Sequence, residues 1–155
     1  MLVMASALLI SQSKVYGQET GGQVGKFTAD LQPRAGSNAT GKAVLQALAD
    51  LKTIWYSINA SGLKDIKSIA ISMDTGTGRA PDVVTLRSAT SEGLMQVPAN
   101  GTSVKGNFTA SDLHGPLDGK RLADFVKAIT DGKIGIRIES SAYPLGEILG
   151  KVNAG

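Results

Sequence analysis

Short apolar stretches recur along the chain at intervals of roughly ten to twenty residues, separated by Gly, Asn, Asp and Pro. This pattern is typical of a β-sandwich or β-barrel built from short strands. The pattern predicts an all-β, antiparallel β-sandwich or Greek-key-like barrel. We place strands at 24–31, 42–46, 55–60, 68–73, 83–86, 104–110, 134–139 and 147–152, the last two forming a closing hairpin.

Alternation within these stretches predicts which side chains face the core. In 68–73, apolar Ile69, Ile71 and Met73 alternate with small residues, so one face of that strand is apolar and the other is small and polar. Trp55 lies in an aromatic and β-branched stretch, and we interpret it as a core residue of the sandwich.

One segment has helical rather than strand periodicity. Leu122, Phe125, Val126 and Ile129 follow the spacing i, i+3, i+4 and i+7, which predicts a short α-helix at about 119–130. Asp118 is the expected N-cap and Gly132 the expected stop. The apolar stripe is expected to pack on one end of the sandwich, although it could instead be a partner-binding face.

Composition narrows the possible functions. A chain of 155 residues accommodates one domain, and 42% apolar residues indicate a folded one. The net charge of +3 is spread along the chain without a basic run, which disfavours nucleic-acid binding. With no cysteine, thiolate catalysis and Cys-based zinc sites are excluded. No serine has the Gly-X-Ser-X-Gly context of a hydrolase, so we expect neither an enzyme nor a cofactor.

The N-terminus has the pattern of an export signal. Residues 1–10 form an apolar run that is too short for a transmembrane helix of roughly 20 residues. Val15 and Gly17 fit a signal-peptidase site, so we predict cleavage after Gly17, a linker at 18–23 and a domain at 24–153, with no transmembrane span in the mature chain. Because no basic residue precedes the run, an upstream start or a buried segment stays open.

Four Asn-X-Ser/Thr sequons provide a second indication of an exported protein. They begin at Asn38, Asn59, Asn100 and Asn107. They are candidate glycosylation sites, and the alternative is that they are ordinary turn residues of a β-rich chain.

The remaining polar residues favour structural roles. His114, the one histidine, lies in a turn-like context, where a solvent-facing loop position is expected. Five loop aspartates could supply oxygen ligands to calcium, but they lack the Asp-X-Asp-X-Asp spacing, and we interpret them as caps and turn residues. They are Asp74, Asp82, Asp112, Asp118 and Asp131.

The order of these segments resembles the chordin-type (CHRD) domain family. The resemblance rests on 27–31, 55–63, 106–113 with the helix that follows, and 144–152, and it spans residues 24–153. The last segment is similar to the family signature Pro-X-Gly-Glu-Ile-Arg-Gly-Gln and contains Pro144, Gly146, Glu147 and Gly150. The end of the predicted signal is also similar to exported proteins of ammonia-oxidising archaea.

The resemblance implies a domain that has lost a metal site. Family members usually carry a His-Ile-His stretch and a further histidine, which could bind metal in a sandwich similar to copper-zinc superoxide dismutase. The matching positions here are Ala70, Ser72 and Glu139. One carboxylate cannot hold a transition metal by itself, so no metal site is expected. Glu147 is expected to be structural, pairing with a nearby Lys or Arg.

We therefore expect a non-catalytic, secreted or cell-surface domain that works by binding or assembly, with a protein partner or with itself through sheet edges. A metal-binding or redox-related protein is the alternative that the lost histidines disfavour. Carbohydrate binding through Trp55, Tyr56 and Tyr143 is a third reading that has little support from so few aromatic residues.

Overall fold

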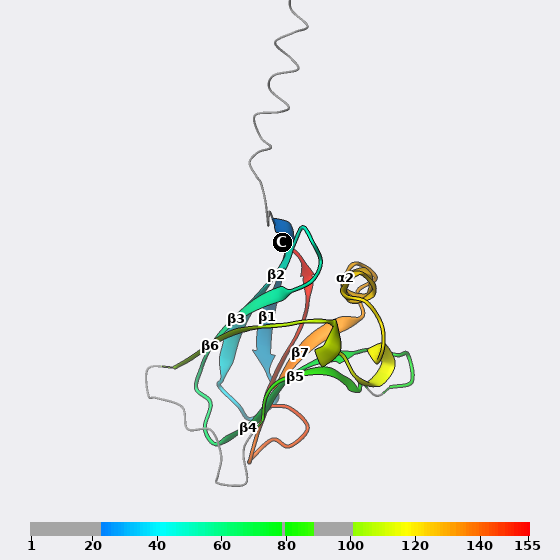
Figure 1. Cartoon of the computed structure of the whole chain (residues 1–155). Helices are drawn as coiled ribbons and strands as arrows, with labels where there is room; N and C mark the ends of the chain where they lie inside the picture. The colour runs from blue at the N-terminus through cyan, green and yellow to red at the C-terminus, as the bar shows by residue number, and fades with distance from the viewer. Residues whose placement is uncertain (1–22, 79, 89–100) are drawn as a thin grey trace, which may run out of the picture.

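The computed structural model describes residues 23–78, 80–88 and 101–155 (Figure 1). The described part contains nine strands, two short 3₁₀ turns and one α-helix. They are β1 (Gln23–Pro33), β2 (Thr40–Leu48), β3 (Ile54–Ser61), β4 (Ile66–Met73), β5 (Asp82–Ser88), β6 (Thr102–Phe108), η2 (Ala110–Asp112), η3 (Gly115–Leu117), α2 (Leu122–Thr130), β7 (Ile134–Ser140), β8 (Ile148–Lys151) and β9 (Asn153–Ala154). All eight strands predicted from the sequence are present; β9 is additional.

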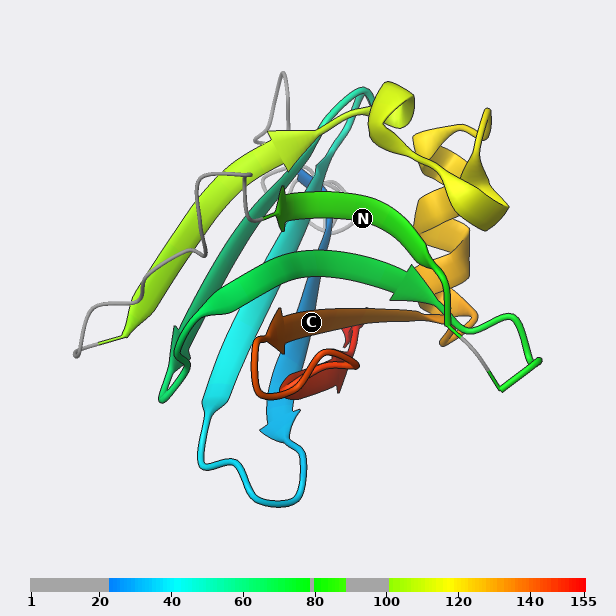
Figure 2. The ribbon, with the colours of Figure 1, turned by 90° about the horizontal axis from the view of Figure 1, so that it is seen from below.

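The strands form one curled antiparallel sheet in the order β5-β4-β7-β8-β1-β2-β3-β6. Strand β1 joins the two halves of this sheet: it pairs with β2 along most of its length, with β9 at Phe27–Thr28 and with β8 at Gln32–Pro33. The sheet curls into a nearly closed barrel, and in Figure 2 strands β4, β5 and β7 cross in front of β1, β2 and β3. The predicted all-β antiparallel fold is thus confirmed.

The core lies inside this curled sheet and follows from alternation along the strands. In β3, every second residue from Ile54 to Ala60 is buried, while its neighbours are exposed or half-buried. β7 alternates in the same way, with Ile134, Ile136 and Ile138 inside. Burial of such side chains contributes roughly 1.5–3 kcal/mol each, so this stripe pattern determines which face of each strand points into the core.

Helix α2 covers one end of the barrel (Figure 2). Phe125 is fully buried, and its ring meets that of Phe108 in a T-shaped contact with centroids 5.3 Å apart. Leu122 and Ile129 are also buried, and Val126 is half-buried against the core. The predicted core-facing stripe is therefore confirmed.

The predicted N-cap of the helix is wrong. Asp118 follows the 3₁₀ turn η3, and Gly119 then takes a left-handed φ of 73°, so the helix starts three residues later than expected. Arg121 is the N-cap, and its backbone N–H donates to Asp124 Oδ2 at 3.0 Å. This bond lowers the pKa of the Asp124 carboxyl.

The predicted helix stop is confirmed at Gly132, which has a φ of 73°. Its N–H donates to Ile129 O, and the N–H of Lys133 donates to Ala128 O. This pair of bonds is the Schellman arrangement, which needs a left-handed residue such as glycine at this position.

Two local expectations need correction. The strand predicted to extend to residue 110 ends at Phe108, because Thr109 begins the 3₁₀ turn η2.

On β4, Ile69 and Ile71 face the core as predicted, but the opposite face is covered too: Ala70 is 1% exposed and Ser72 8%. Strands β5 and β7 flank Ala70 with Thr85 and Arg137, whose longer side chains shield it.

No helix in the described ranges is long and apolar enough to cross a membrane.

Candidate functional site

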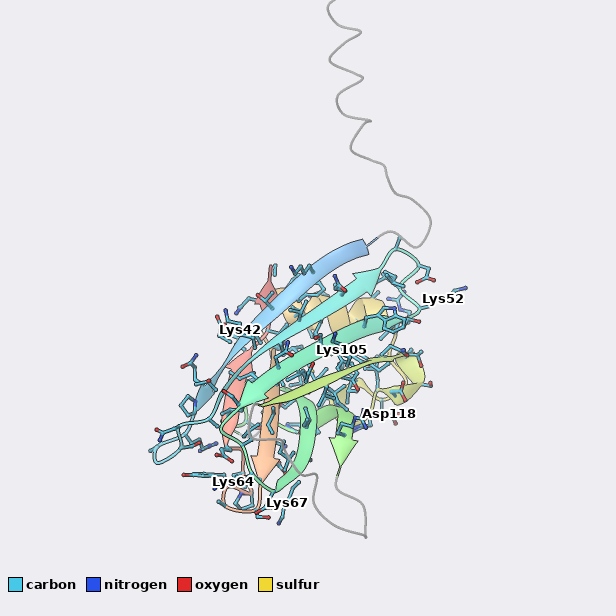
Figure 3. All side chains as sticks on the ribbon, turned by 90° about the vertical axis from the view of Figure 1, so that its left-hand side faces the viewer. Lys42, Lys52, Lys64, Lys67, Lys105 and Asp118 are labelled. Carbon is cyan, nitrogen blue, oxygen red and sulfur yellow. The ribbon has the colours of Figure 1, made fainter. Side chains whose placement is uncertain are left out.

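The outer face of β1, β2, β3 and β6 carries a row of exposed side chains from each strand, and we call it the open face. Side chains on these strands alternate between the core and this face. Figure 3 views the open face, with Lys42 and Lys105 upon it. Its other exposed residues are Lys26, Asp30, Gln32, Thr40, Gln46, Trp55, Asn59, Ser61, Ser103 and Asn107.

Among the described residues, Trp55 is the one large apolar side chain that is exposed on the open face, with 47% of its surface exposed. It pairs in register with Gln46 of β2 and Asn107 of β6, so an amide side chain lies on each side of the indole. The prediction that Trp55 packs in the core is wrong. Tyr56 takes the inward position instead, and its ring covers Gly106 on the neighbouring strand.

Two hollows mark the open face. One, of about 470 Å³, lies beside Trp55 and is lined by Gln46, Ser57 and Lys105. The other, of about 690 Å³, is lined by the opposite ends of the same strands, including Asp30, Lys42, Asn59 and Ser103. Both volumes fall in the roughly 300–1,000 Å³ range of small-ligand sites.

Three of the four sequon asparagines lie within the described ranges, and all three are exposed. Asn38 is in the β1–β2 loop, whereas Asn59 and Asn107 are on the open face. Asn100 lies outside the described residues.

A charged cluster occupies the outer face of the other half of the sheet. Arg137 Nη2 donates to Asp82 Oδ1 at 2.6 Å, joining β7 to β5. Its Nε lies 3.0 Å from Glu139 Oε1, but off the N–H direction, so this contact is an ion pair without a hydrogen bond. Ser68 Oγ donates to the other oxygen of Glu139 at 3.0 Å. One guanidinium thus holds two carboxylates together.

The electrostatics of this cluster indicate a structural rather than a catalytic role. The side chains of Arg137 and Asp82 are only 20% and 31% exposed. Burial raises the pKa of Asp82, and the neighbouring Arg137 opposes that rise. A guanidinium stays protonated in proteins, so Arg137 neutralises charge but cannot serve as a general base.

The positions matched to the family histidines share this face. Ala70 is paired with Arg137, and Glu139 with Ser68, while Ser72 lies two residues further along β4. Their side chains carry between them one carboxylate, and it is engaged by Arg137 and Ser68. In the described part of the chain, no three His, Asp or Glu side chains form a group suited to a metal ion.

The single histidine and most of the aspartates have individual structural roles. His114 is exposed, as expected, with Nε2 3.3 Å from Thr85 Oγ1. Asp74 accepts the Gly76 N–H at 2.8 Å, and Asp112 accepts the Thr109 N–H at 2.8 Å, so both are turn or cap residues as interpreted. Asp82 is not a loop residue, because β5 begins there.

Other aspartates are also held by local contacts. Asp131 Oδ2 accepts a hydrogen bond from Lys127 Nζ at 2.8 Å, which lowers the pKa of the Asp131 carboxyl. Asp118 is exposed at the end of η3.

The signature segment 144–150 anchors the loop between β7 and β8. Glu147 is 7% exposed and accepts a hydrogen bond from Ser37 Oγ at 2.7 Å, so a hydroxyl occupies the place where we expected a Lys or Arg. Gly146 has a φ of 114° and packs against the aliphatic stem of Arg137. Pro144 is exposed.

Gly150 completes this anchor. A Cβ at Gly150 would overlap the carbonyl oxygen of Asp30 on β1. Gly150 of the signature therefore allows β8 to pack closely against β1.

The hollow beside Trp55 was not recognised from the sequence. Ile54, Tyr56, Ile58 and Ala60 alternate as an inward row, and this row requires Trp55 to face outward. The two-residue alternation of β3 therefore indicates, from the sequence alone, that Trp55 faces outward. The partners Gln46 and Lys105 could not be found without the register of β2 and β6.

Comparison with known proteins identifies the family. A model of the CHRD domain matches residues 7–152, beginning earlier than the resemblance quoted from the sequence. No curated protein and no solved structure gives a match. Domains of this family are in general non-catalytic. Because the family model covers nearly the whole chain, this protein belongs to the CHRD domain family.

Proposed function

We propose that this chain is a non-catalytic, secreted or cell-surface domain that works by binding, with the open face as its contact surface. The observation that carries the proposal is Trp55, a half-exposed indole near one end of β3, on a solvated sheet face and beside a hollow. Tryptophan is the residue type most enriched among energetically dominant contacts in interfaces. The family membership supports a non-catalytic role.

The open face suits binding better than the sheet edge does. Within the described residues, β6 pairs only with β3, so its other edge could extend the sheet into a second copy. Lys105 stands in the middle of β6, however, and edge lysines oppose such pairing. Binding through the open face does not require Lys105 to be accommodated at a strand edge, and it buries the Trp55 indole.

Single cysteines test this proposal, because the chain has none of its own. Ser103→Cys places a thiol on the open face, and Ser141→Cys places one in the β7–β8 loop, where Ser141 is also exposed. A membrane-impermeant maleimide is applied to intact cells of the native host and to protein purified from them. Both thiols are expected to react in purified protein. On cells, Ser141→Cys reacts and Ser103→Cys is protected.

Each departure from this result has a definite meaning. Equal labelling of both thiols on cells contradicts binding through the open face. Labelling of neither thiol on intact cells, with labelling after lysis, contradicts a surface location. A glycan on nearby Asn59 does not confuse the comparison, because protein purified from the same host retains it.

The mature form of the protein tests export and modification together. We expect protein from its own host to start at Gln18 and to be heavier than its polypeptide, with sugar on the exposed asparagines Asn38, Asn59 or Asn107. N-terminal sequencing and intact mass measure both properties. A chain that still begins at Met1 would contradict export, and a mass equal to the bare polypeptide would contradict glycosylation.

A further inference from the structure

The hollow beside Trp55 combines a flat apolar wall with polar groups of several kinds. The indole forms the wall, and the amide of Gln46, the hydroxyl of Ser57 and the ammonium of Lys105 surround it. A sugar ring offers matching chemistry, with an apolar C–H face and hydroxyls at its edge. We propose that this hollow binds an acidic saccharide, one that carries carboxylate or sulfate groups. The inference rests on the proposed function, since it names the ligand of the open face.

Strand register fixes these groups around one space. Trp55 pairs with Gln46, and Ser57, two residues further along β3, pairs with Lys105. Trp55 and Lys105 are diagonal neighbours on the face, a relation that separates side-chain bases by roughly 7–8 Å. One sugar ring stacked on the indole can therefore present a charged substituent to the Lys105 ammonium.

The charges of the open face favour an anionic ligand over a neutral one. Among the described residues it carries three lysines, Lys26, Lys42 and Lys105, and a single acidic residue, Asp30. Asp30 is paired with Lys42 at 3.2 Å. Lys105 forms no ion pair with any described residue, so its charge is available to a ligand.

A saccharide fits this surface better than a protein partner does. The centre of a protein–protein interface is usually depleted in charge and contains several buried apolar residues. The open face exposes one large apolar side chain, with half-buried Val44 beside it, in a field of Lys, Gln, Asn, Ser and Thr. This composition matches a ligand that stacks on one aromatic ring and otherwise makes hydrogen bonds.

Because Trp55 is the one tryptophan of the chain, its fluorescence reports the site directly. The experiment uses the full chain made in a host that does not N-glycosylate. The probes are oligogalacturonate as the acidic saccharide, a neutral galactose oligomer and polyglutamate as a non-saccharide polyanion. Oligogalacturonate is expected to change the emission saturably, and more strongly at low salt than at high salt. Calorimetry measures the affinities of all variants.

Paired variants separate stacking from charge. Trp55→Ala is expected to weaken oligogalacturonate binding by about tenfold, and Trp55→Phe to restore most of it. Lys105→Gln is expected to weaken binding of the acidic probe roughly threefold and to leave any binding of the neutral one unchanged. Lys67→Gln, which removes an exposed lysine from β4, is the matched control and is expected to have no effect.

Three results would overturn the inference. The first is that oligogalacturonate gives no saturable change in emission. The second is that polyglutamate binds as tightly as oligogalacturonate and still binds the Trp55→Ala variant. The third is that Lys67→Gln weakens oligogalacturonate binding as much as Lys105→Gln does. None of these touches the maleimide test, so the face could still bind a ligand of another class. Protection of Ser103→Cys on cells without oligosaccharide binding would keep the proposed function and reject the saccharide.

Discussion

Replacing Gly150 with alanine is expected to lower the free energy of unfolding by about 3 kcal/mol or more. The new methyl group would overlap the backbone carbonyl of Asp30 and come within 2.8 Å of Leu31 Cδ2. Backbone atoms of a paired strand cannot move aside as a flexible side chain can. The pairing of β8 with β1, at Gln32–Leu149 and Pro33–Ile148, is expected to be lost or displaced.

Gly135→Ala is the matched control for this substitution. Gly135 is also an extended glycine, on the adjacent strand β7, and its Cβ would come no nearer than 3.2 Å to the carbonyl oxygen of Gly150, with the next atoms at 3.9 Å. Urea unfolding followed by circular dichroism compares the two variants. We expect Gly135→Ala to cost less than about 1 kcal/mol. Equal stability of the two variants would refute the idea that the close approach of β1 to β8 requires glycine at position 150.

Arg137→Gln is expected to lower the free energy of unfolding by about 2 kcal/mol at neutral pH. The substitution leaves Asp82 and Glu139 as like charges on a partly buried surface without their shared cation. It also removes part of the stem on which Gly146 packs. Arg87→Gln, on the exposed side of β5, makes the same chemical change and is expected to cost less than about 0.5 kcal/mol.

The loss caused by Arg137→Gln should grow with pH. Burial raises the pKa of Asp82 in the folded protein above 3.8, and removing Arg137 removes the interaction that opposes the rise. Because the pKa of Asp82 is higher in the folded than in the unfolded protein, the contribution of this carboxyl to stability is most favourable below pH 3.8. The contribution falls as the pH increases through the folded pKa. The variant has the higher folded pKa and therefore loses more stability over this interval.

Urea midpoints measured from pH 3 to pH 7 test this dependence. The difference between wild type and Arg137→Gln is expected to be smallest at pH 3. Adding Asp82→Asn to the variant should recover part of the stability, because an unpaired carboxylate is removed. A pH-independent difference would show that lost packing, and not charge, is responsible.

The sequence predicted the strands and the helix well because both depend on local periodicity. The row Ile134, Ile136 and Ile138 specifies a strand with one buried face wherever it lies in the sheet. The stripe through Leu122, Phe125 and Ile129 specifies a helix in the same way.

Two local mistakes came from weighing residue type above position. The aromatic and β-branched stretch around Trp55 favours a core position for it, but the alternation of β3 directs it outward. Asp118 was chosen as N-cap for its chemistry, but the chain makes a 3₁₀ turn and a left-handed glycine before the helix begins. In both cases backbone geometry overrode the preference of one side chain.

The contacts that form the candidate sites could not be predicted locally. Arg137 and Asp82 are 55 residues apart in the sequence, and Ser37 and Glu147 are 110 apart. Such pairs depend on strand order and register, which alternation alone does not determine. For the same reason the neighbours of Trp55 emerged only from the structure.

The pairing of β1 with β8 and β9 has a consequence for how the protein folds. The contacts that join the two halves of the sheet connect segments on the order of a hundred residues apart, and such topologies fold slowly because a long loop must be closed first. A chain still being synthesised lacks residues 148–154 until late, so one edge of β1 stays unpaired until then. The two halves of the sheet therefore join last, where the first strand meets the final ones.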